Sequence, residues 1–367
     1  MRISKQKHSF ETFIDELIRD VEPGKRLRVV CYFAHHGDWE TESYQIPSLR
    51  SILISNAVEI TELGDIKRLV AHYRDFQTNQ LVRVVFFAFL HPDTGLLMCF
   101  TNNAKKDVEQ TLDKIVEKNP GLYFAFIDPL TLDKIQSMLF ETHPSALVTY
   151  FSAYRNRRFS LKGDIRPDYE RTIEYRALDG KKVLEELRHS YGVLPRSIHF
   201  EIPEFATYYI HSIGHFTLAK GEESARRFLL EIADFAMKET LLTRRTVESA
   251  DFQLIPIETK RKTFLFPKLK PWIIKFSGPI NIQAGHDLVD ILEENSYDTF
   301  NYVLTEGSLR FNGLITDRLK GSIFTIDSNA ERMVIAPLGE VPFDSFLRFY
   351  RTLVENFDPK ASCLAFE

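Results

Sequence analysis

The stretch LVRVVFFAFL, residues 81–90, is one of the longest apolar runs of the chain and decides the fold that the sequence predicts. Its β-branched and aromatic residues favour a strand, and its continuous apolarity is typical of a strand covered on both faces. Three shorter runs have the same character, namely RLRVVCYFA (26–34), GLLMCFT (95–101) and LYFAFID (122–128). Such strands are common in sheets that lie between helical layers. We therefore expect an α/β N-terminal domain with a Rossmann-like layered sheet.

Helical and turn signals surround these runs. SFETFIDELIRDV (9–21) has apolar residues at helical spacing and Ser9 as its expected N-cap, and residues 104–119 carry a second apolar stripe. HPDTG (91–95) predicts a hairpin turn between two strands.

The composition of the chain changes after residue 155. Residues 155–182 are polar, basic and rich in turn residues, which indicates a crossing between domains. Beyond them we expect a long helix near 222–243, a meander over 301–337 and an amphipathic helix over 343–357. The predicted organisation is an α/β domain over residues 1–155 and an α+β domain with a mostly antiparallel sheet over residues 156–367.

Length and composition limit the class of protein. A chain of 367 residues is long enough for two cores, and 44% hydrophobic with 27% charged residues is ordinary for a globular protein. The apolar runs are shorter than the roughly 20 residues of a membrane helix, the N-terminus lacks an apolar signal region, and the three cysteines are widely spaced. We expect a cytoplasmic protein without membrane contact. Only 16 glycines occur, with no GxGxxG or GxxxxGK[ST] motif, so no cofactor is expected.

CYFAHHGDWETE (31–42) places two histidines and several carboxylates just past an expected strand end, where α/β sheets bind ligands. Neighbouring residues of an extended chain point to opposite faces, so His35 and His36 can face one ion only if Gly37 turns the chain. A polar loop is the favoured interpretation. A site that includes Asp38 and Glu40 is the alternative.

HSIGH (211–215) contains two histidines four residues apart. Its surroundings, TYYIHSIGHFTL, are aromatic and β-branched, which predicts one continuous strand. Four residues of a strand span ~13 Å, which is too far for one zinc ion. We expect His211 and His215 to be independent surface or cleft histidines.

ADFQLIPIETK (250–260) has the outline of a metal-dependent nuclease motif, with Asp251, Glu258 and Lys260 as its triad. The short spacing between the aspartate and the Glu-x-Lys triplet departs from the usual arrangement on two strands. No Gly-x-Ser-x-Gly elbow and no activated cysteine occurs in the sequence.

Positive charge and aromatic residues gather in two segments, 150–166 and 260–276. Basic groups beside aromatic rings are what single-stranded nucleic acids and phosphate backbones select. A solvated basic face with inward-pointing aromatics is the simpler interpretation. The candidate nucleic-acid-binding residues are Arg155, Arg157, Arg158, Lys162, Lys260, Arg261, Lys262, Lys268 and Lys270.

Three hypotheses about function follow. The first is a binding or assembly subunit that contacts nucleic acid or an acidic protein partner through these basic segments. The second is a metal-dependent phosphodiesterase or nuclease that uses either the residues around His35 and His36 or the triad of Asp251, Glu258 and Lys260. The third is a small-molecule sensor with a pocket at the carboxyl edge of the N-terminal sheet.

Overall fold

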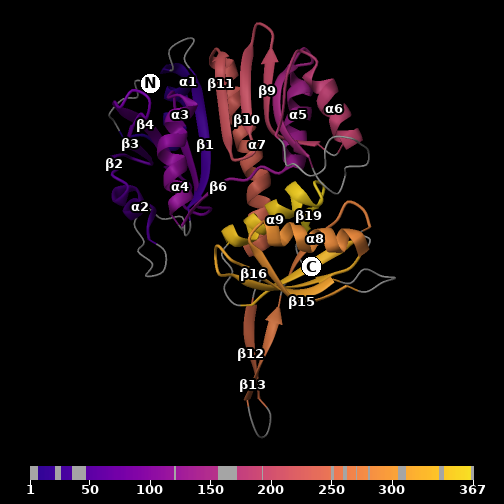
Figure 1. The fold of residues 1–367 in the computed structure, drawn as a ribbon. Helices are drawn as coiled ribbons and strands as arrows, with labels where there is room; N and C mark the ends of the chain where they lie inside the picture. Colours follow the sequence, from indigo (N-terminus) through magenta and orange to yellow (C-terminus); the bar gives the residue numbers. More distant parts are fainter. Residues whose placement is uncertain are drawn as a thin grey trace.

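The computed structural model describes residues 7–20, 26–34, 47–119, 121–155, 172–191, 193–248, 252–258, 263–269, 271–279, 282–304, 311–338 and 343–364. These residues form an eleven-stranded sheet, a six-stranded sheet and a separate two-stranded hairpin. Figure 1 shows the eleven-stranded sheet at the top, the six-stranded sheet below it, and the hairpin extending away from the six-stranded sheet.

The eleven-stranded sheet has the order β2-β3-β4-β5-β1-β11-β10-β9-β7-β8, with β6 also paired to β1. Its strands are β1 (Leu27–Ala34), β2 (Glu59–Leu63), β3 (Ile66–Arg74), β4 (Leu81–Leu90), β5 (Leu96–Thr101), β6 (Leu122–Phe124), β7 (Leu147–Arg155), β8 (Ile173–Arg176), β9 (Val193–Ile202), β10 (Ala206–His211) and β11 (His215–Gly221). Each of the pairings between them is antiparallel. The fold is mixed α/β as expected, but the expectation of a Rossmann-like sheet is wrong.

Short connections explain the antiparallel order. Gly64, with φ of +78°, joins β2 to β3, and between β3 and β4 the Asp75 N–H donates to the Gln80 carbonyl at 2.9 Å. HPDTG forms the predicted hairpin turn between β4 and β5, where the Gly95 N–H donates to the His91 carbonyl at 3.0 Å. A parallel pair would need a crossover of about a dozen or more residues, and these turns are too short for one.

Both faces of β4 and β1 are nevertheless covered, as their apolarity predicted. On one face pack α1 (Phe10–Asp20), α5 (Pro129–Thr142), α6 (Gly180–Tyr191) and α7 (Glu223–Glu248), and on the other α2 (Leu49–Ser55) and the continuous segment α3 (Lys105–Val108), η1 (Glu109–Asp113) and α4 (Lys114–Lys118). The second group covers only the part of its face formed by β1 and β3–β5 (Figure 1). On that side, the face formed by β7–β11 carries polar and aromatic side chains, among them Tyr150, His199 and Tyr209.

The helices predicted at 9–21 and 104–119 are confirmed as α1 and as the segment α3 to α4. Ser9 caps α1 as predicted, because its Oγ accepts a hydrogen bond from the Thr12 N–H at 3.3 Å. Phe13 and Leu17 of α1 are fully buried against the sheet. The residues that carry the periodic apolar pattern therefore form helices, as their local sequence indicates.

The six-stranded sheet is antiparallel, in agreement with the expectation for the second half of the chain. Its order is β15-β16-β17-β18-β14-β19. Its elements are β14 (Trp272–Lys275), α8 (Ile282–Glu294), β15 (Tyr297–Leu304), β16 (Phe311–Asp317), β17 (Ile323–Ser328), β18 (Arg332–Pro337), α9 (Phe343–Asn356) and β19 (Ser362–Leu364). The hairpin consists of β12 (Phe252–Glu258) and β13 (Thr263–Leu269).

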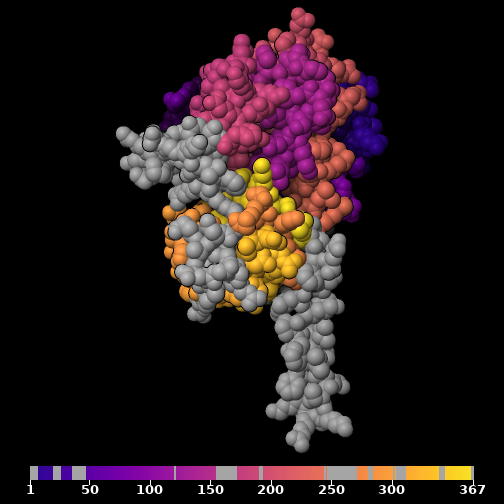
Figure 2. Space-filling model, turned by 90° about the vertical axis from the view of Figure 1, so that its right-hand side faces the viewer, coloured from indigo at the N-terminus to yellow at the C-terminus, as the bar shows by residue number. Residues whose placement is uncertain are grey.

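The 26-residue helix α7 joins the two sheets, since it packs on β1 and β11 at one end and on α9 and β19 at the other. Phe126, which follows β6, lies in the core of the six-stranded unit. Figure 2 shows α5 directly above the C-terminal residues, with the two units in contact. The expected division of the chain at residue 155 stays a prediction, although the large sheet takes strands from both sides of that residue.

Among the described residues, no helix combines the length and apolarity that crossing a bilayer requires.

Candidate functional site

A row of polar and aromatic side chains crosses the face of the large sheet that α3 to α4 leave uncovered. Residues directly opposite each other on antiparallel strands share a face, so strand register alone brings this row together. The row runs across β8, β7, β9, β10, β11 and β1 as Arg176, Tyr150, His199, Tyr209, Thr217 and Arg28. Two residues further along the strands, Ser197, His211 and His215 form a second row on the same face.

The two rows line a cavity of about 390 Å³. Its floor is made of Tyr150, Ser197, His199, Tyr209, Ile210, His211, His215, Thr217 and Ala219, and its cations are Arg26, Arg28, Lys105 and Arg176. Ser197, His215 and Thr217 are buried, whereas Arg26, Lys105 and Arg176 are exposed at the rim. No carboxylate lines the cavity among the described residues. An excess of positive charge over a polar floor attracts anions.

Arg28 is the cation held most firmly. Its Nε donates to the Asn103 carbonyl at 2.9 Å, and its NH1 donates to Thr217 Oγ1 at 2.7 Å. Burial, assisted by the charge of Arg26, lowers the pKa of Arg28. Lys105 lies 3.3 Å from Glu109 in an exposed pair, which contributes little and leaves the ammonium available to a ligand.

The aromatic part of the row is closely packed. The ring centroid of His199 lies 4.3 Å from that of Tyr150 and 3.9 Å from that of Tyr209. The guanidinium carbon of Arg176 lies 5.7 Å from the centroid of Tyr150. His199 is tilted by 40° against Tyr150 and meets Tyr209 edge-on at 73°. A planar ligand can therefore stack on a single ring face or on the guanidinium of Arg176.

Two of the cavity histidines, His199 and His211, are neutral at pH 7. Burial, assisted by Arg176 and Lys105, lowers the pKa of His199 to about 4. Burial also lowers the pKa of His211 to about 3, with contributions from His215, Lys105, Arg351 and Arg196. A neutral imidazole offers one donor and one acceptor to a ligand.

His211 and His215 face each other across a hairpin, and the expectation of one continuous strand is wrong. β10 ends at His211, residues 212–214 turn, and β11 starts at His215, so the two ring centroids are 6.3 Å apart. The reason is Gly214, which adopts φ of +80° and donates its N–H to the His211 carbonyl at 3.1 Å. Glycine in this conformation is typical of short hairpin loops. The tripeptide Ser-Ile-Gly (212–214) was therefore a hairpin signal in the sequence.

A buried carboxylate lies behind His215. Asp113 Oδ1 accepts a hydrogen bond from the Tyr32 hydroxyl at 2.6 Å and lies 3.2 Å from His215 Nε2. The second contact is an ion-pairing distance without the direction of a hydrogen bond. Asp113 is the last residue of the π-helical turn η1, and such turns often occur at functional sites.

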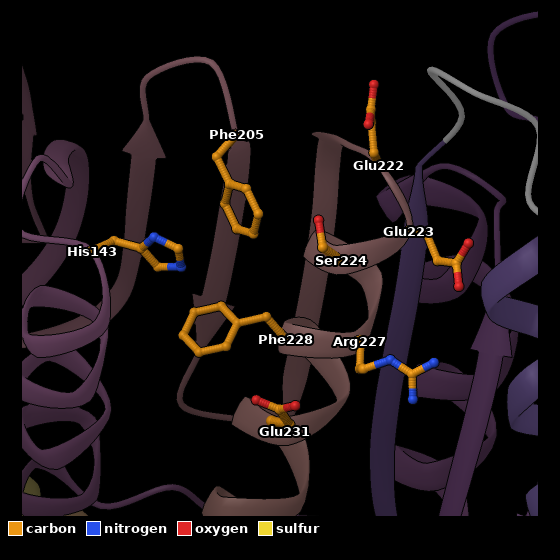
Figure 3. A pocket seen from close by; sticks show the side chains of 8 residues that line it. All are labelled: His143, Phe205, Glu222, Glu223, Ser224, Arg227, Phe228 and Glu231. Atoms are coloured by element: carbon orange, nitrogen blue, oxygen red, sulfur yellow. The ribbon is translucent and has the colours of Figure 1, made fainter.

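Two other cavities carry the opposite charge. One of about 700 Å³ between α5, α7 and β19 is lined by Asp128, Asp133, Glu141 and Glu239, with Lys134 as its cation. The other, of about 580 Å³, lies at the start of α7, where His143 sits beside Phe205 and Phe228 (Figure 3). Its lining also holds three glutamates, Glu222, Glu223 and Glu231, and one arginine, Arg227. Of these cavities, the one on the open sheet face is the one suited to an anion.

Most residues singled out as sites in the sequence lie outside the described part of the chain. This holds for Arg157, Arg158, Lys162, Lys260, Arg261, Lys262, Lys270, Asp251, His35, His36, Asp38 and Glu40. Arg155 ends β7 and Lys268 lies in β13, so the backbones of the two basic segments belong to different sheets at these points. Glu258 ends β12 opposite Thr263.

Two aromatic residues of the basic segments have opposite positions. Tyr150 lines the cavity, whereas Trp272 is buried in the core of the six-stranded unit. Sequence reasoning missed His199, Tyr209, Arg28, Lys105 and Arg176 as site residues. The signal available in the sequence was the alternation of polar with apolar residues within the strands, as with Thr207, Tyr209 and His211 of β10.

Two comparisons with known proteins match this chain. A family described as the AF_0896_M family middle domain matches residues 132–212, which span α5 to β10. A protein of Archaeoglobus fulgidus, described as uncharacterized, is 26% identical over 264 residues, covering 70% of this chain and 71% of its own length. The family match includes Tyr150, Arg176, His199 and His211 but not Arg28. The cavity therefore combines this middle segment with strands from outside it.

Proposed function

We propose that the chain binds a nucleotide unit, free or within a single-stranded nucleic acid, in the cavity on the open sheet face. The observation that carries this proposal is the combination of four cations with a closely packed aromatic row and no lining carboxylate among the described residues. Phosphate oxygens would contact Arg28, Lys105 and Arg26. The base would lie on the row that includes Tyr150 and His199.

Size and chemistry support a nucleotide over a bare anion. A volume of about 390 Å³ is within the range of small-molecule sites, roughly 300 to 1,000 Å³. Exposed sheet faces with aromatic residues stack bases in known single-strand readers, and neutral imidazoles can bond base edges. Nucleic-acid contact is thus proposed here as it was from the sequence. The proposed site, however, is this cavity and not the two basic segments.

Removing the two exposed rim cations Arg26 and Lys105 together is expected to weaken binding about tenfold or more. Each lost phosphate contact should also reduce the slope of log affinity against log salt by roughly 0.7 for a single strand. The measurement is fluorescence anisotropy of a labelled ten-nucleotide single strand, with wild type and R26Q/K105Q, at about 50 and about 200 mM salt.

The matched control is R227Q, which removes one exposed cation from α7 on the opposite face of the sheet and should leave affinity unchanged. If a mononucleotide competes and inorganic phosphate at the same concentration does not, a free nucleotide is a sufficient ligand. If only oligonucleotides compete, the ligand is a single strand. Equal affinity and equal salt slope for wild type and R26Q/K105Q would contradict the proposal.

A further inference from the structure

The cations of the cavity lie at both ends of its aromatic row and not at one end only. Arg26 and Arg28 lie at one end, just before and on β1, and Arg176 lies at the other end, on β8. The rings between the two ends are those of Tyr150, His199 and Tyr209. A free nucleotide carries its phosphate on one side of its base, so that phosphate can engage only one of the two charged ends.

The geometry of the sheet sets the distance between these ends. The guanidinium of Arg28 is held over β11 by its hydrogen bond to Thr217 at 2.7 Å, and that of Arg176 lies 5.7 Å from the ring centroid of Tyr150 on β7. In the sheet, β11 and β7 are three strand spacings apart, which is ~14 Å. Stacked nucleotides follow each other at ~3.4 Å, so about four of them span this distance.

The floor between the two charged ends suits bases better than phosphates. His199 is neutral at pH 7 because burial, assisted by Arg176 and Lys105, lowers its pKa to about 4. Neutral rings stack on bases of any sequence, whereas guanidinium groups bind phosphate oxygens. Arg26 and Arg176 are both exposed. A strand can therefore enter the cavity at one end and leave it at the other.

We infer that the ligand of this cavity is a single strand of about four nucleotides or more that lies across the sheet, and not a free nucleotide. One phosphate of the strand lies on Arg28 and a later phosphate lies on Arg176, with the bases between them on ring faces of the aromatic row. Arg176 is therefore the residue that distinguishes a strand from a mononucleotide. This inference rests on the proposed function, because it names the ligand class of the same cavity.

One carboxylate lies near the Arg176 end. Glu174 precedes Arg176 by two residues on β8, so both residues belong to the same face of the sheet. Burial, together with the Glu174 carboxylate, raises the pKa of Tyr150, which places this carboxylate beside the row. A carboxylate repels a phosphate, so Glu174 should weaken the hold of this end on a strand. A mononucleotide bound through Arg28 should not sense this repulsion.

The test measures affinity against strand length. Oligonucleotides of one to six residues with a 5′-phosphate, in a ribose and a deoxyribose series, compete with a labelled strand in fluorescence anisotropy at about 50 mM salt. For wild type, affinity should rise about tenfold or more from one to four nucleotides in at least one series, and the series with the larger rise identifies the sugar.

Variants at the second charged end assign this rise to Arg176. R176Q should lose most of the rise and bind the mononucleotide like wild type, whereas R176K, which keeps the charge without the planar group, should keep it. E174Q should bind the four-nucleotide strand about two- to threefold more tightly than wild type. R227Q, on the opposite face of the sheet, is the matched control and should behave like wild type. All these positions are exposed, so the variants should fold.

The outcomes separate this inference from the proposed function. Equal affinity for one and four nucleotides would overturn the inference and leave the proposed function in place. A loss of mononucleotide affinity in R176Q would show that Arg176 stacks on the base, and a rise with length that R176Q keeps in full would show that the strand does not reach Arg176. Either result would also overturn the inference. Failure of every length to bind would overturn the proposed function as well.

Discussion

Replacing Gly214 with alanine is expected to destabilise the protein by roughly 3 kcal/mol or more. Gly214 has φ of +80°, and an added Cβ would lie 2.8 Å from the Cys31 carbonyl oxygen and 3.0 Å from the Ala125 carbonyl oxygen. Both neighbours are backbone atoms of segments bonded to each other, since the Cys31 carbonyl accepts a hydrogen bond from the Ala125 N–H at 3.3 Å. The measurement is the free energy of unfolding in urea.

Gly321→Ala is the matched control for this change. Gly321 has φ of +70° and nothing within 4 Å of an added Cβ, so its variant should show only the cost of the backbone conformation, roughly 1–2 kcal/mol. The difference between the two variants measures the close approach at the hairpin. Equal destabilisation by Gly214→Ala and Gly321→Ala would contradict the described packing of residues 212–214.

Acid is expected to destabilise the protein through His199. Burial, assisted by Arg176 and Lys105, lowers its pKa from 6.5 to about 4, so between these values the unfolded chain binds a proton that the folded chain does not. Stability from this group is therefore complete above pH 6.5 and is lost as the pH falls toward 4. After allowance for solvent screening, the free energy of unfolding of His199→Gln should fall by about 1–2 kcal/mol less on acidification than that of wild type.

Urea unfolding of wild type, H199Q and the exposed control H189Q, at neutral pH and near pH 5, measures this effect. An identical loss of stability in wild type and H199Q on acidification would show that His199 is not held neutral by its surroundings.

The elements could be predicted from the sequence where local burial decides them. Residues 9–21 and 104–119 carry one-sided apolar stripes, and both are helices packed against the sheet. The continuous apolarity of 81–90 correctly indicated cover on both faces. It carries no information on strand direction, which the short turns at Gly64, 75–80 and 91–95 determine.

The site could not be predicted in the same way, because it depends on pairings between distant segments. Arg28, Tyr150 and Tyr209 become neighbours only through the register of β1, β7, β9, β10 and β11. No short motif contains them, and charge density along the chain pointed instead to segments whose side chains lie largely outside the described residues. His211 and His215 were noticed, and only the turn at Gly214 was misread.

The most direct test of the account is a crystal structure of the protein with a short 2′-O-methyl strand that contains 5-bromouridine. We expect anomalous signal from bromine beside Tyr150 and His199, with a phosphate within hydrogen-bonding distance of Arg28 and Lys105. A strand bound on another surface, with the cavity occupied only by solvent, would contradict the central claim that this sheet face binds nucleotides.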